Sequence, residues 1–340
     1  MRGMNADLRS FLTALPKTEL HVHLVGAASV DTVLELARRH PGAGVPTERE
    51  ALVAYYEFTD FAHFIDVYIR VNALVRTPED VESLVVGAAR DMAGQNIRYA
   101  ELTVTPDSHL LMGISADGVA EALTVGRTRA ASEHGVQLAW VFDIPGELGL
   151  ESGERTVDWV ERHAPEGSVG FGLGGPEVGV PRPQFERVFA RARALGLHSV
   201  PHAGETTGPQ TIRDALDTLG AERIGHGIAA AHERELLERL AAEGVALEVC
   251  PTSNLRTRAV ASLAEHPLPV LLDAGIAVTL GSDDPGMFDT TLVNEYVVAA
   301  EVLGVSRDGL VEIARTGVRK SYAPDALKRQ LLDEIDGYAR

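Results

Sequence analysis

The stretch LHSVPHAGETTGPQTIRDALDTLGAERIGHG, residues 197–227, contains one complete copy of the pattern that decides the fold. Residues 197–202 and 222–227, at its two ends, are short candidate strands. Between them, residues 209–219 have the apolar spacing of an amphipathic helix, and Gly220 follows as a helix-ending residue. A strand, a helix and a second strand in this order predict a parallel βαβ unit.

The same alternation runs along the whole chain. Candidate helices lie at residues 30–40, 78–94, 116–134, 183–195, 209–219 and 232–244. Candidate strands lie at residues 19–25, 97–104, 138–143, 168–173, 197–202, 222–227, 246–250 and 276–281. Eight such strands in 340 residues favour an α/β fold of the closed (β/α)8 type, the TIM barrel, over an open doubly wound sheet. Because no low-complexity linker interrupts the pattern, we expect a single domain over residues 1–340.

Composition narrows the possible partners and the compartment. The formal net charge of −18 would repel nucleic acids and anionic membrane surfaces, and the sequence contains no basic patch that would override it. The single cysteine, Cys250, excludes an intrachain disulfide framework and fits a reducing compartment. The first twenty residues contain neither the apolar core nor the small-residue cleavage site of a signal peptide, and no stretch approaches the roughly 20 apolar residues of a membrane-spanning helix. We therefore expect a cytoplasmic protein with a small-molecule ligand; the oligomeric state is not indicated.

Chemically distinctive residues fall at the predicted strand ends, where TIM barrels form their active sites. His21 and His23 end the first strand, and Gly175 follows the fourth. PHAGE at residues 201–205, RIGHG at 223–227 and GSDDP at 281–285 end the fifth, sixth and eighth strands. His21 and His23 are two residues apart, so their side chains face the same way with Cα atoms about 6.6 Å apart. These motifs are expected to converge on one mouth of the barrel.

Two imidazoles on one face can bind a single metal ion. A catalytic zinc site usually has three protein ligands and a water, sometimes with a fifth ligand, and His202 and Asp283 are the natural further ligands. The alternative for an isolated histidine pair is that both side chains are solvated or packed in the core. Convergence with the PHAGE and SDDP motifs favours metal binding.

Three further residues suit acid–base chemistry, and each has a simpler structural interpretation. Glu205 is placed to carry a proton beside His202, or else to cap a helix. His226 lies between two glycines that permit close approach, or else it is a core histidine. In an extended segment Asp284 would point away from its neighbour Asp283, which would divide metal binding from substrate binding, or else the pair begins a turn at Pro285.

Other conspicuous segments carry weaker signals. Residues 55–70 place Phe58, Phe61, Phe64 and Tyr68 at helical spacing, which predicts core packing or a lid over a pocket. Cys250 has no evident base beside it and is interpreted as a small buried side chain rather than a nucleophile. GFGLGG at residues 170–175 is not a dinucleotide fingerprint, because no helix begins at the required spacing.

Five motifs in order, ELHVHL, LGGPE, HAGE, IGHG and SDDP, resemble those of the adenosine deaminase-like branch of the metal-dependent amidohydrolases. The resemblance covers residues 16 to 294 and implies hydrolytic deamination of a 6-aminopurine nucleoside. The HxE and PCxxC ligands of cytidine deaminase-type zinc enzymes are missing. The resemblance to the adenosine deaminase-like branch also implies one Zn²⁺ per chain, with the following ligands: His21, His23, His202 and Asp283.

The resemblance further implies a role for each remaining motif residue. His226, helped by Asp283, would orient and deprotonate a water for attack on C6 of the purine. Glu205 would donate a proton to N1, which requires a raised pKa. Asp284 would bind the N7 edge and the backbone N–H of Gly175 would bind N3. The resemblance also places His23 and Val25 among the substrate-binding residues.

Val25 departs from the family pattern. Members that act on adenosine typically have aspartate there, and its carboxylate binds the ribose 5′-hydroxyl. Valine cannot accept that hydrogen bond, and a buried hydroxyl without a partner costs roughly 1–3 kcal/mol. The sequence therefore looks more like the branch that deaminates 6-aminodeoxyfutalosine in menaquinone biosynthesis, whose substrate carries a benzoate-ended arm. Candidate partners for that carboxylate are Arg70, Arg98 and Arg182.

Several alternatives stay open. Adenosine itself, 5′-modified adenosines such as 5′-deoxyadenosine or methylthioadenosine, and free adenine are possible substrates of the same chemistry. A purine-binding barrel without activity is a second class, although relics of that kind usually lose a ligand or the proton donor. An amidohydrolase acting on an amide or lactone ring is a third, because the fold alone does not determine the reaction.

Overall fold

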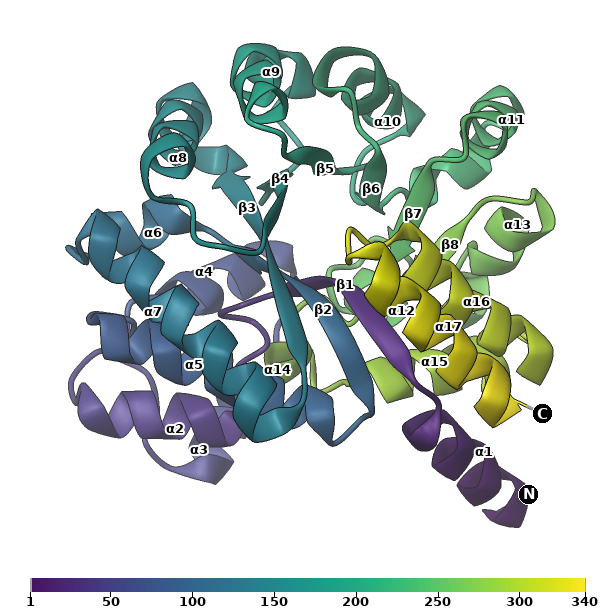
Figure 1. The fold of residues 1–340 in the computed structure, drawn as a ribbon, viewed down its shortest axis with the longest axis horizontal. Coiled ribbons are helices and arrows are strands. Elements are labelled where there is room, and N and C mark those ends of the chain that lie inside the picture. Colours follow the sequence, from purple (N-terminus) through teal and green to yellow (C-terminus); the bar gives the residue numbers. More distant parts are fainter. Residues whose placement is uncertain (1, 340) are drawn as a thin grey trace.

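The computed structural model describes residues 2–339, with the side chains of residues 7–60 and 62–339. Eight parallel strands form one sheet in which each strand pairs with the next in sequence order (Figure 1). This arrangement is the (β/α)8 barrel predicted from the alternation. The strands are β1 (Lys17–His23), β2 (Ile97–Val104), β3 (Gln137–Pro145), β4 (Ser168–Gly174), β5 (His198–Ala203), β6 (Arg223–His226), β7 (Ala246–Val249) and β8 (Val278–Leu280).

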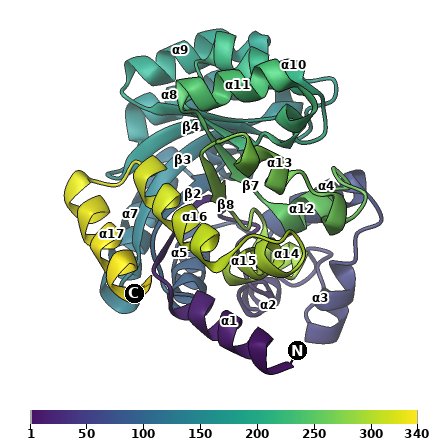
Figure 2. The same cartoon turned by 90° about the vertical axis from the view of Figure 1, so that its right-hand side faces the viewer.

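Helices surround the strands on the outside of the barrel (Figures 1 and 2). None of those within residues 2–339 has the length and apolar character needed to span a bilayer. The helices are α1 (Arg2–Ala14), α2 (Val30–Arg39), α3 (Arg49–Tyr55), α4 (Phe61–Asn72), α5 (Pro78–Ala93), α6 (Pro106–Leu111), α7 (Ala116–Arg129), α8 (Gly149–His163), α9 (Glu186–Ala194), α10 (Pro209–Asp214), α11 (Arg234–Glu243), α12 (Pro251–Arg256), α13 (Leu268–Asp273), α14 (Pro285–Phe288), α15 (Leu292–Glu301), α16 (Arg307–Lys320) and α17 (Asp325–Ala339).

The barrel closes where the segment after β8 meets β1. The backbone N–H of Asp283 donates to the carbonyl of His21 at 3.0 Å, and the N–H of His23 donates to the carbonyl of Asp283 at 2.9 Å. Two distant motifs, ELHVHL and SDDP, are thus joined by main-chain hydrogen bonds. Their side chains are held in a fixed relation by the fold itself.

Strand boundaries differ from the predicted ones in a way that matters for Val25. Strand β1 begins and ends two residues before the predicted range 19–25, so His23 is its last residue and Val25 lies in the turn that follows. The alternation of apolar residues continues past the point where β1 leaves the sheet. The predicted helix at 116–134 is α7, which ends at Arg129 and continues through His134 as a wider helical turn.

The insertion between β1 and β2 forms α3 and α4. Phe64 is buried, and its ring lies 4.8 Å from that of Phe288 and 5.3 Å from that of Phe58. Within the aromatic stripe, Phe58 and Phe64 thus pack against Phe288 of α14, while Phe64 and Tyr68 also line the pocket, so both core packing and a lid stay as interpretations. Helix α4 also borders the pocket described below; the side chain of Phe61 lies outside the described residues.

Candidate active site

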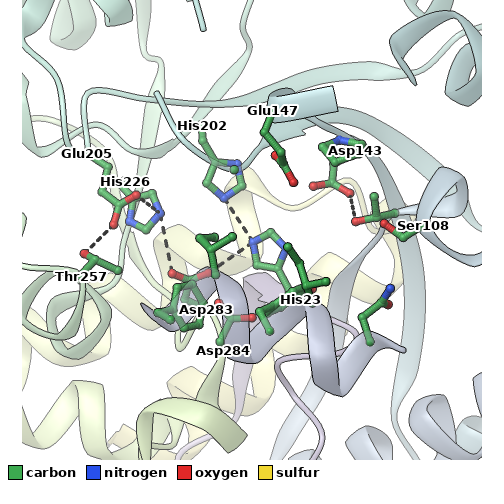
Figure 3. A pocket seen from close by; sticks show the side chains of 18 residues that line it. His23, Ser108, Asp143, Glu147, His202, Glu205, His226, Thr257, Asp283 and Asp284 are labelled. Carbon is green, nitrogen blue, oxygen red and sulfur yellow. Dashed lines mark hydrogen bonds and ion pairs between the residues drawn. The ribbon is translucent and has the colours of Figure 1, made fainter. Parts of the chain in front are cut away.

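Four side chains from three places in the sequence converge at the carboxyl ends of the strands. His21 and His23 come from β1, His202 from β5, and Asp283 from the segment after β8. One ligand atom of each lies within 4.8 Å of the others. The Nε2 atom of His23 is 3.2 Å from Asp283 Oδ1 and 3.2 Å from His202 Nε2 (Figure 3). The structure thus brings together the four residues predicted to bind a metal ion.

The donor atoms of this cluster suit a divalent cation. The Nδ1 of His21 lies 2.9 Å from Glu248 Oε2, so the carboxylate fixes the proton on Nδ1. The Nε2 of His21 is buried, makes no hydrogen bond with the described residues and lies 3.5 Å from Asp283 Oδ1, so this nitrogen faces the cluster. Burial, with repulsion from His21 and His23, holds the pKa of His202 well below its usual value, so this imidazole is neutral. Hydrogen bonds with buried carboxylates outweigh burial at the other two imidazoles and raise the pKa of His21 to about 10 and that of His23 to about 9, so a bound cation would take the place of their protons. Neutral imidazoles and a carboxylate are the donors that zinc prefers.

Glu248 was not identified from the sequence. It extends inward from β7 and accepts from Arg223 Nε at 2.6 Å on its other oxygen. Arg223 in turn bonds to Glu101 of β2, on the other side of the barrel. Buried charges of this kind need partners, and here each carboxylate has one. The floor of the metal cluster is therefore a buried ion-pair chain rather than an apolar layer.

Backbone strain occurs at two of the motif residues. Asp283 and His226 have φ angles of 63° and 61°, in the left-handed region that non-glycine residues rarely adopt. Such conformations cost of order 1–3 kcal/mol and gather at functional sites. Ser253 donates to Asp283 Oδ2 at 2.6 Å and holds that carboxylate in place.

Glu205 lies beside His226 with its side chain almost fully buried. Its Oε1 accepts from Thr257 at 2.8 Å, and its Oε2 is 3.7 Å from His226 Nε2. Burial, with repulsion from Asp283 and Glu177, raises the pKa of Glu205 to about 8. At neutral pH the group is mainly protonated and can donate. It does not cap α10, whose N-cap residue is Gly208.

Glu177, the last residue of LGGPE, organises the loop that carries Glu205. Its carboxylate accepts from the backbone N–H groups of Glu205, Thr206 and Thr207 at 3.2, 3.0 and 2.9 Å. The Thr207 hydroxyl adds a fourth bond at 2.6 Å. Sequence reasoning used this motif as a whole and did not single out Glu177, although its position in LGGPE was the available signal.

Asp284 lines the same pocket as Asp283. Its Oδ1 is buried and has no hydrogen-bond partner among the described residues, and burial and the charge of Asp283 raise its pKa to about 8. A Cβ atom at Gly26 would lie 1.6 Å from this oxygen, so no other residue fits there. Gly175, with a φ of 76°, also borders the pocket.

One pocket of about 790 Å³ opens to solvent beside the cluster (Figure 3). Its lining includes three of the four candidate ligands, His23, His202 and Asp283, together with Glu205, His226 and Asp284. One wall is apolar and comes from α4, with Phe64, Ile65, Tyr68 and Ile69. Another wall carries the carboxyl groups of Asp143 and Glu147. Among the described residues that line the pocket there is no lysine or arginine.

The three arginines considered for a substrate carboxylate are engaged elsewhere. Arg70 pairs with Asp66 at 2.9 Å, and Arg98 pairs with Glu334 at 2.9 Å. Arg182 is buried and donates to the carbonyl of His202 at 3.1 Å. Arg182 therefore supports the chain at a motif histidine rather than facing the pocket.

Val25 is buried behind the main pocket. It lines a small adjoining cavity that shares Tyr68, Asn72, Thr105 and Ser108 with the main one. The group at position 25 can therefore act only on a substrate portion that reaches this recess.

Cys250 is buried, and burial raises the pKa of its thiol well above the usual value, which agrees with an unreactive side chain.

Comparison with known proteins places this geometry in context. The family model described as Adenosine deaminase matches residues 16–338. The chain is 56% identical to the aminodeoxyfutalosine deaminase of Streptomyces coelicolor over 98% of this chain and 86% of that protein. The crystal structure of an adenine deaminase from Arthrobacter aurescens superposes with a TM-score of 0.91 at 33% identity, covering 96% of this chain and 99% of that one. An amidohydrolase from Burkholderia ambifaria with bound Zn has a TM-score of 0.89 at 26% identity, covering 97% and 93%.

Proposed function

Because the chain belongs to the adenosine deaminase family, whose members hydrolytically deaminate aminopurine compounds, we propose that it is a zinc-dependent deaminase of 6-aminodeoxyfutalosine. The observation that carries the catalytic part is the convergence of the four candidate ligands beside one pocket, which three of them line together with Glu205 and His226. All eight strands form one sheet, which supports a single catalytic domain over residues 1–340.

The residues proposed to hold zinc are the converging cluster: His21, His23, His202 and Asp283. The buried Nε2 of His21, which faces Asp283, and the neutral His202 support this assignment, as does the zinc bound to the Burkholderia ambifaria relative. When bound, Zn²⁺ would supply a water nucleophile near neutral pH by lowering the pKa of that water to about 7.

The acid and base functions are assigned from position and protonation. His226 and Asp283 orient the attacking water, and Asp283 takes its proton as the oxygen bonds to C6. Glu205, protonated at neutral pH, gives its proton to N1 as the C6–N1 double bond becomes single. The Asp283 proton then goes to the amino group, ammonia leaves, and the hydroxyl proton returns to Glu205 as the C6 carbonyl forms. Asp284 binds the N7 edge and the N–H of Gly175 binds N3.

The substrate assignment rests on Val25 and on the relatives. Val25 offers no acceptor to a 5′-hydroxyl, whereas the apolar wall of α4 suits an extended aromatic arm. The name of the Streptomyces coelicolor relative supports the same substrate and a place in menaquinone biosynthesis. The single unpaired thiol of Cys250 supports a reducing compartment such as the cytoplasm.

Adenine is the second candidate substrate, because the Arthrobacter aurescens relative is an adenine deaminase of nearly the same fold. Adenine has no ribose and would leave the recess beside Val25 unused. Dependence of the rate on the sugar therefore separates the two candidates.

The deciding experiment measures ammonia release by the zinc-loaded protein with aminodeoxyfutalosine, adenosine, 5′-deoxyadenosine, methylthioadenosine and adenine side by side. The proposal predicts the highest kcat/KM for aminodeoxyfutalosine. A higher value for adenine or adenosine would overturn the substrate assignment and leave the chemistry standing. No ammonia from any of them, at one zinc per chain, would overturn the catalytic assignment.

A further inference from the structure

A chain of side-chain hydrogen bonds leads away from His226 into the wall of the barrel. The Nδ1 of His226 lies 3.1 Å from the side-chain amide nitrogen of Asn254, in α12. The amide oxygen of Asn254 lies 3.1 Å from Nε2 of His266. The Nδ1 of His266 accepts from the backbone N–H of Leu268 at 3.1 Å. All three side chains are at least 97% buried, so water does not compete for these bonds.

The direction of every bond in this chain follows from its last member. Leu268 is the first residue of α13, and a backbone N–H can only donate, so His266 Nδ1 must be the unprotonated nitrogen. Burial lowers the pKa of His266 to about 4, which keeps the ring neutral with its one proton on Nε2. That proton is donated to the oxygen of Asn254. The amide is thereby oriented with its NH₂ group toward His226.

We infer that Asn254 and His266 are positioning residues that lock neutral His226 in the tautomer with its proton on Nε2, so that His226 donates a hydrogen bond at the reacting centre and does not serve as the base. Nδ1 of His226 accepts from the Asn254 amide, and the ring proton is therefore on the nitrogen that faces Glu205 and Asp283. These carboxyl groups lie 3.7 and 3.8 Å from Nε2. The inference rests on the proposed function and divides the roles of His226 and Asp283 within it.

The Nε2–H tautomer of His226 determines where each proton goes in the addition step. As the water oxygen bonds to C6, its proton goes to Asp283, because Nε2 of His226 already carries one. The Nε2–H group donates to the oxygen that becomes bonded to C6 and stabilises the charge that develops there. Glu205 delivers the remaining proton to N1. Neither Asn254 nor His266 touches the substrate in this scheme.

The tautomer can be read directly by ¹⁵N NMR of the zinc-loaded protein labelled at histidine nitrogens, with the His226 signals assigned by their loss in His226→Ala. The expected spectrum shows a protonated Nε2 and an unprotonated Nδ1 for His226. A proton on Nδ1 in the unmodified protein would overturn the inference whatever the activity. Because this readout does not depend on turnover, it separates failure of the lock from failure of the proposed reaction.

Asn254→Asp is the smallest substitution that should reverse the tautomer of His226. A carboxylate can only accept, so His226 must donate from Nδ1, and a ring that stays neutral then has no proton on Nε2. We expect the NMR proton to move to Nδ1 and kcat to fall about 100- to 1,000-fold, the loss found when one donor to a developing oxyanion is removed. A proton that moves with kcat unchanged would refute the donor role of His226.

His266 separates the tautomer from the added charge of Asn254→Asp. His266→Leu removes the donor to Asn254 without introducing a charge, so the amide is free to rotate and a mixture of tautomers is expected, with lower kcat. His266→Gln can still donate to the Asn254 oxygen and should retain more of kcat than His266→Leu. Asn294→Asp, in α15 and paired with Arg9 and Thr290, is the matched control and should leave kcat unchanged. Equal losses in both His266 variants, with an unshifted His226 tautomer, would indicate a purely structural role.

Discussion

Thr257 is expected to set the pH range in which Glu205 can donate its proton. Burial, then repulsion from Asp283 and Glu177, raises the pKa of Glu205 to about 8, while the hydrogen bond from Thr257 opposes this rise. Glu205 works as an acid, so activity requires its protonated form. With a pKa of about 8, about nine-tenths of the enzyme is protonated at pH 7, and kcat/KM falls about tenfold per unit at higher pH.

Thr257→Val removes the hydroxyl and keeps the shape of the side chain. A hydrogen bond to a charged acceptor is worth about 1.5–3 kcal/mol and one to a neutral acceptor about 0.5–1.5 kcal/mol, so the bond favours the carboxylate by roughly 1–1.5 kcal/mol. Since 1.36 kcal/mol corresponds to one pKa unit, its loss should raise the pKa of Glu205 by about one unit. The basic limb of the pH profile moves toward higher pH in the variant.

The assay is kcat/KM for the preferred substrate from pH 6 to 10, at equal zinc content, for the unmodified protein, Thr257→Val and Thr257→Ser. Serine retains the hydroxyl and should keep the original limb. Glu205→Gln should lose the limb together with most of kcat, since an amide cannot donate this proton. A limb that stays in place or moves to lower pH in Thr257→Val would refute the assignment of Glu205 as the titrating acid.

Three further predictions concern the substrate and the loop. Val25→Asp should raise kcat/KM for adenosine relative to aminodeoxyfutalosine by about 5- to 150-fold, equivalent to a hydrogen bond of about 1–3 kcal/mol; an unchanged ratio would show that Val25 does not set the choice. Phe64→Ala should raise KM because it opens the α4 wall, whereas lower thermal stability with unchanged KM would indicate core packing alone. Glu177→Gln puts an NH₂ group against backbone donors and should lower kcat at least about tenfold at unchanged zinc content. Full activity in this variant would show that Glu177 does not position Glu205.

The barrel and the metal cluster could be predicted because both depend on spacing that survives errors in element boundaries. Strand β1 begins and ends two residues before its predicted range, yet His21 and His23 still lie at its carboxyl end with the same two-residue separation. The other two candidate ligands, His202 and Asp283, also lie at strand ends. The parallel barrel then brings these ends together regardless of loop length.

The partners that set protonation states could not be predicted in this way. His226 and Asn254 are 28 residues apart, and Glu177 and Glu205 are likewise joined only by the packing of separate loops. No periodicity links such pairs, and an asparagine is common at a turn or helix end without any such partner. The direction of the hydrogen bond at His226 depends on a backbone N–H at the start of α13, which has no signature in the side-chain sequence.

The charge of the pocket bears on how an arm that ends in a carboxylate would be accepted. Asp143, Glu147 and Asp284 line the pocket without a lysine or arginine among its described lining residues, and burial raises the pKa of each. Such a wall suits the neutral edges of a purine and disfavours a buried anion, so the carboxylate is best left at the solvent-exposed mouth. Recognition of the arm then depends on apolar contact with α4 and on the missing acceptor at Val25. For this reason a change at Val25, rather than at an arginine, is the informative test of substrate choice.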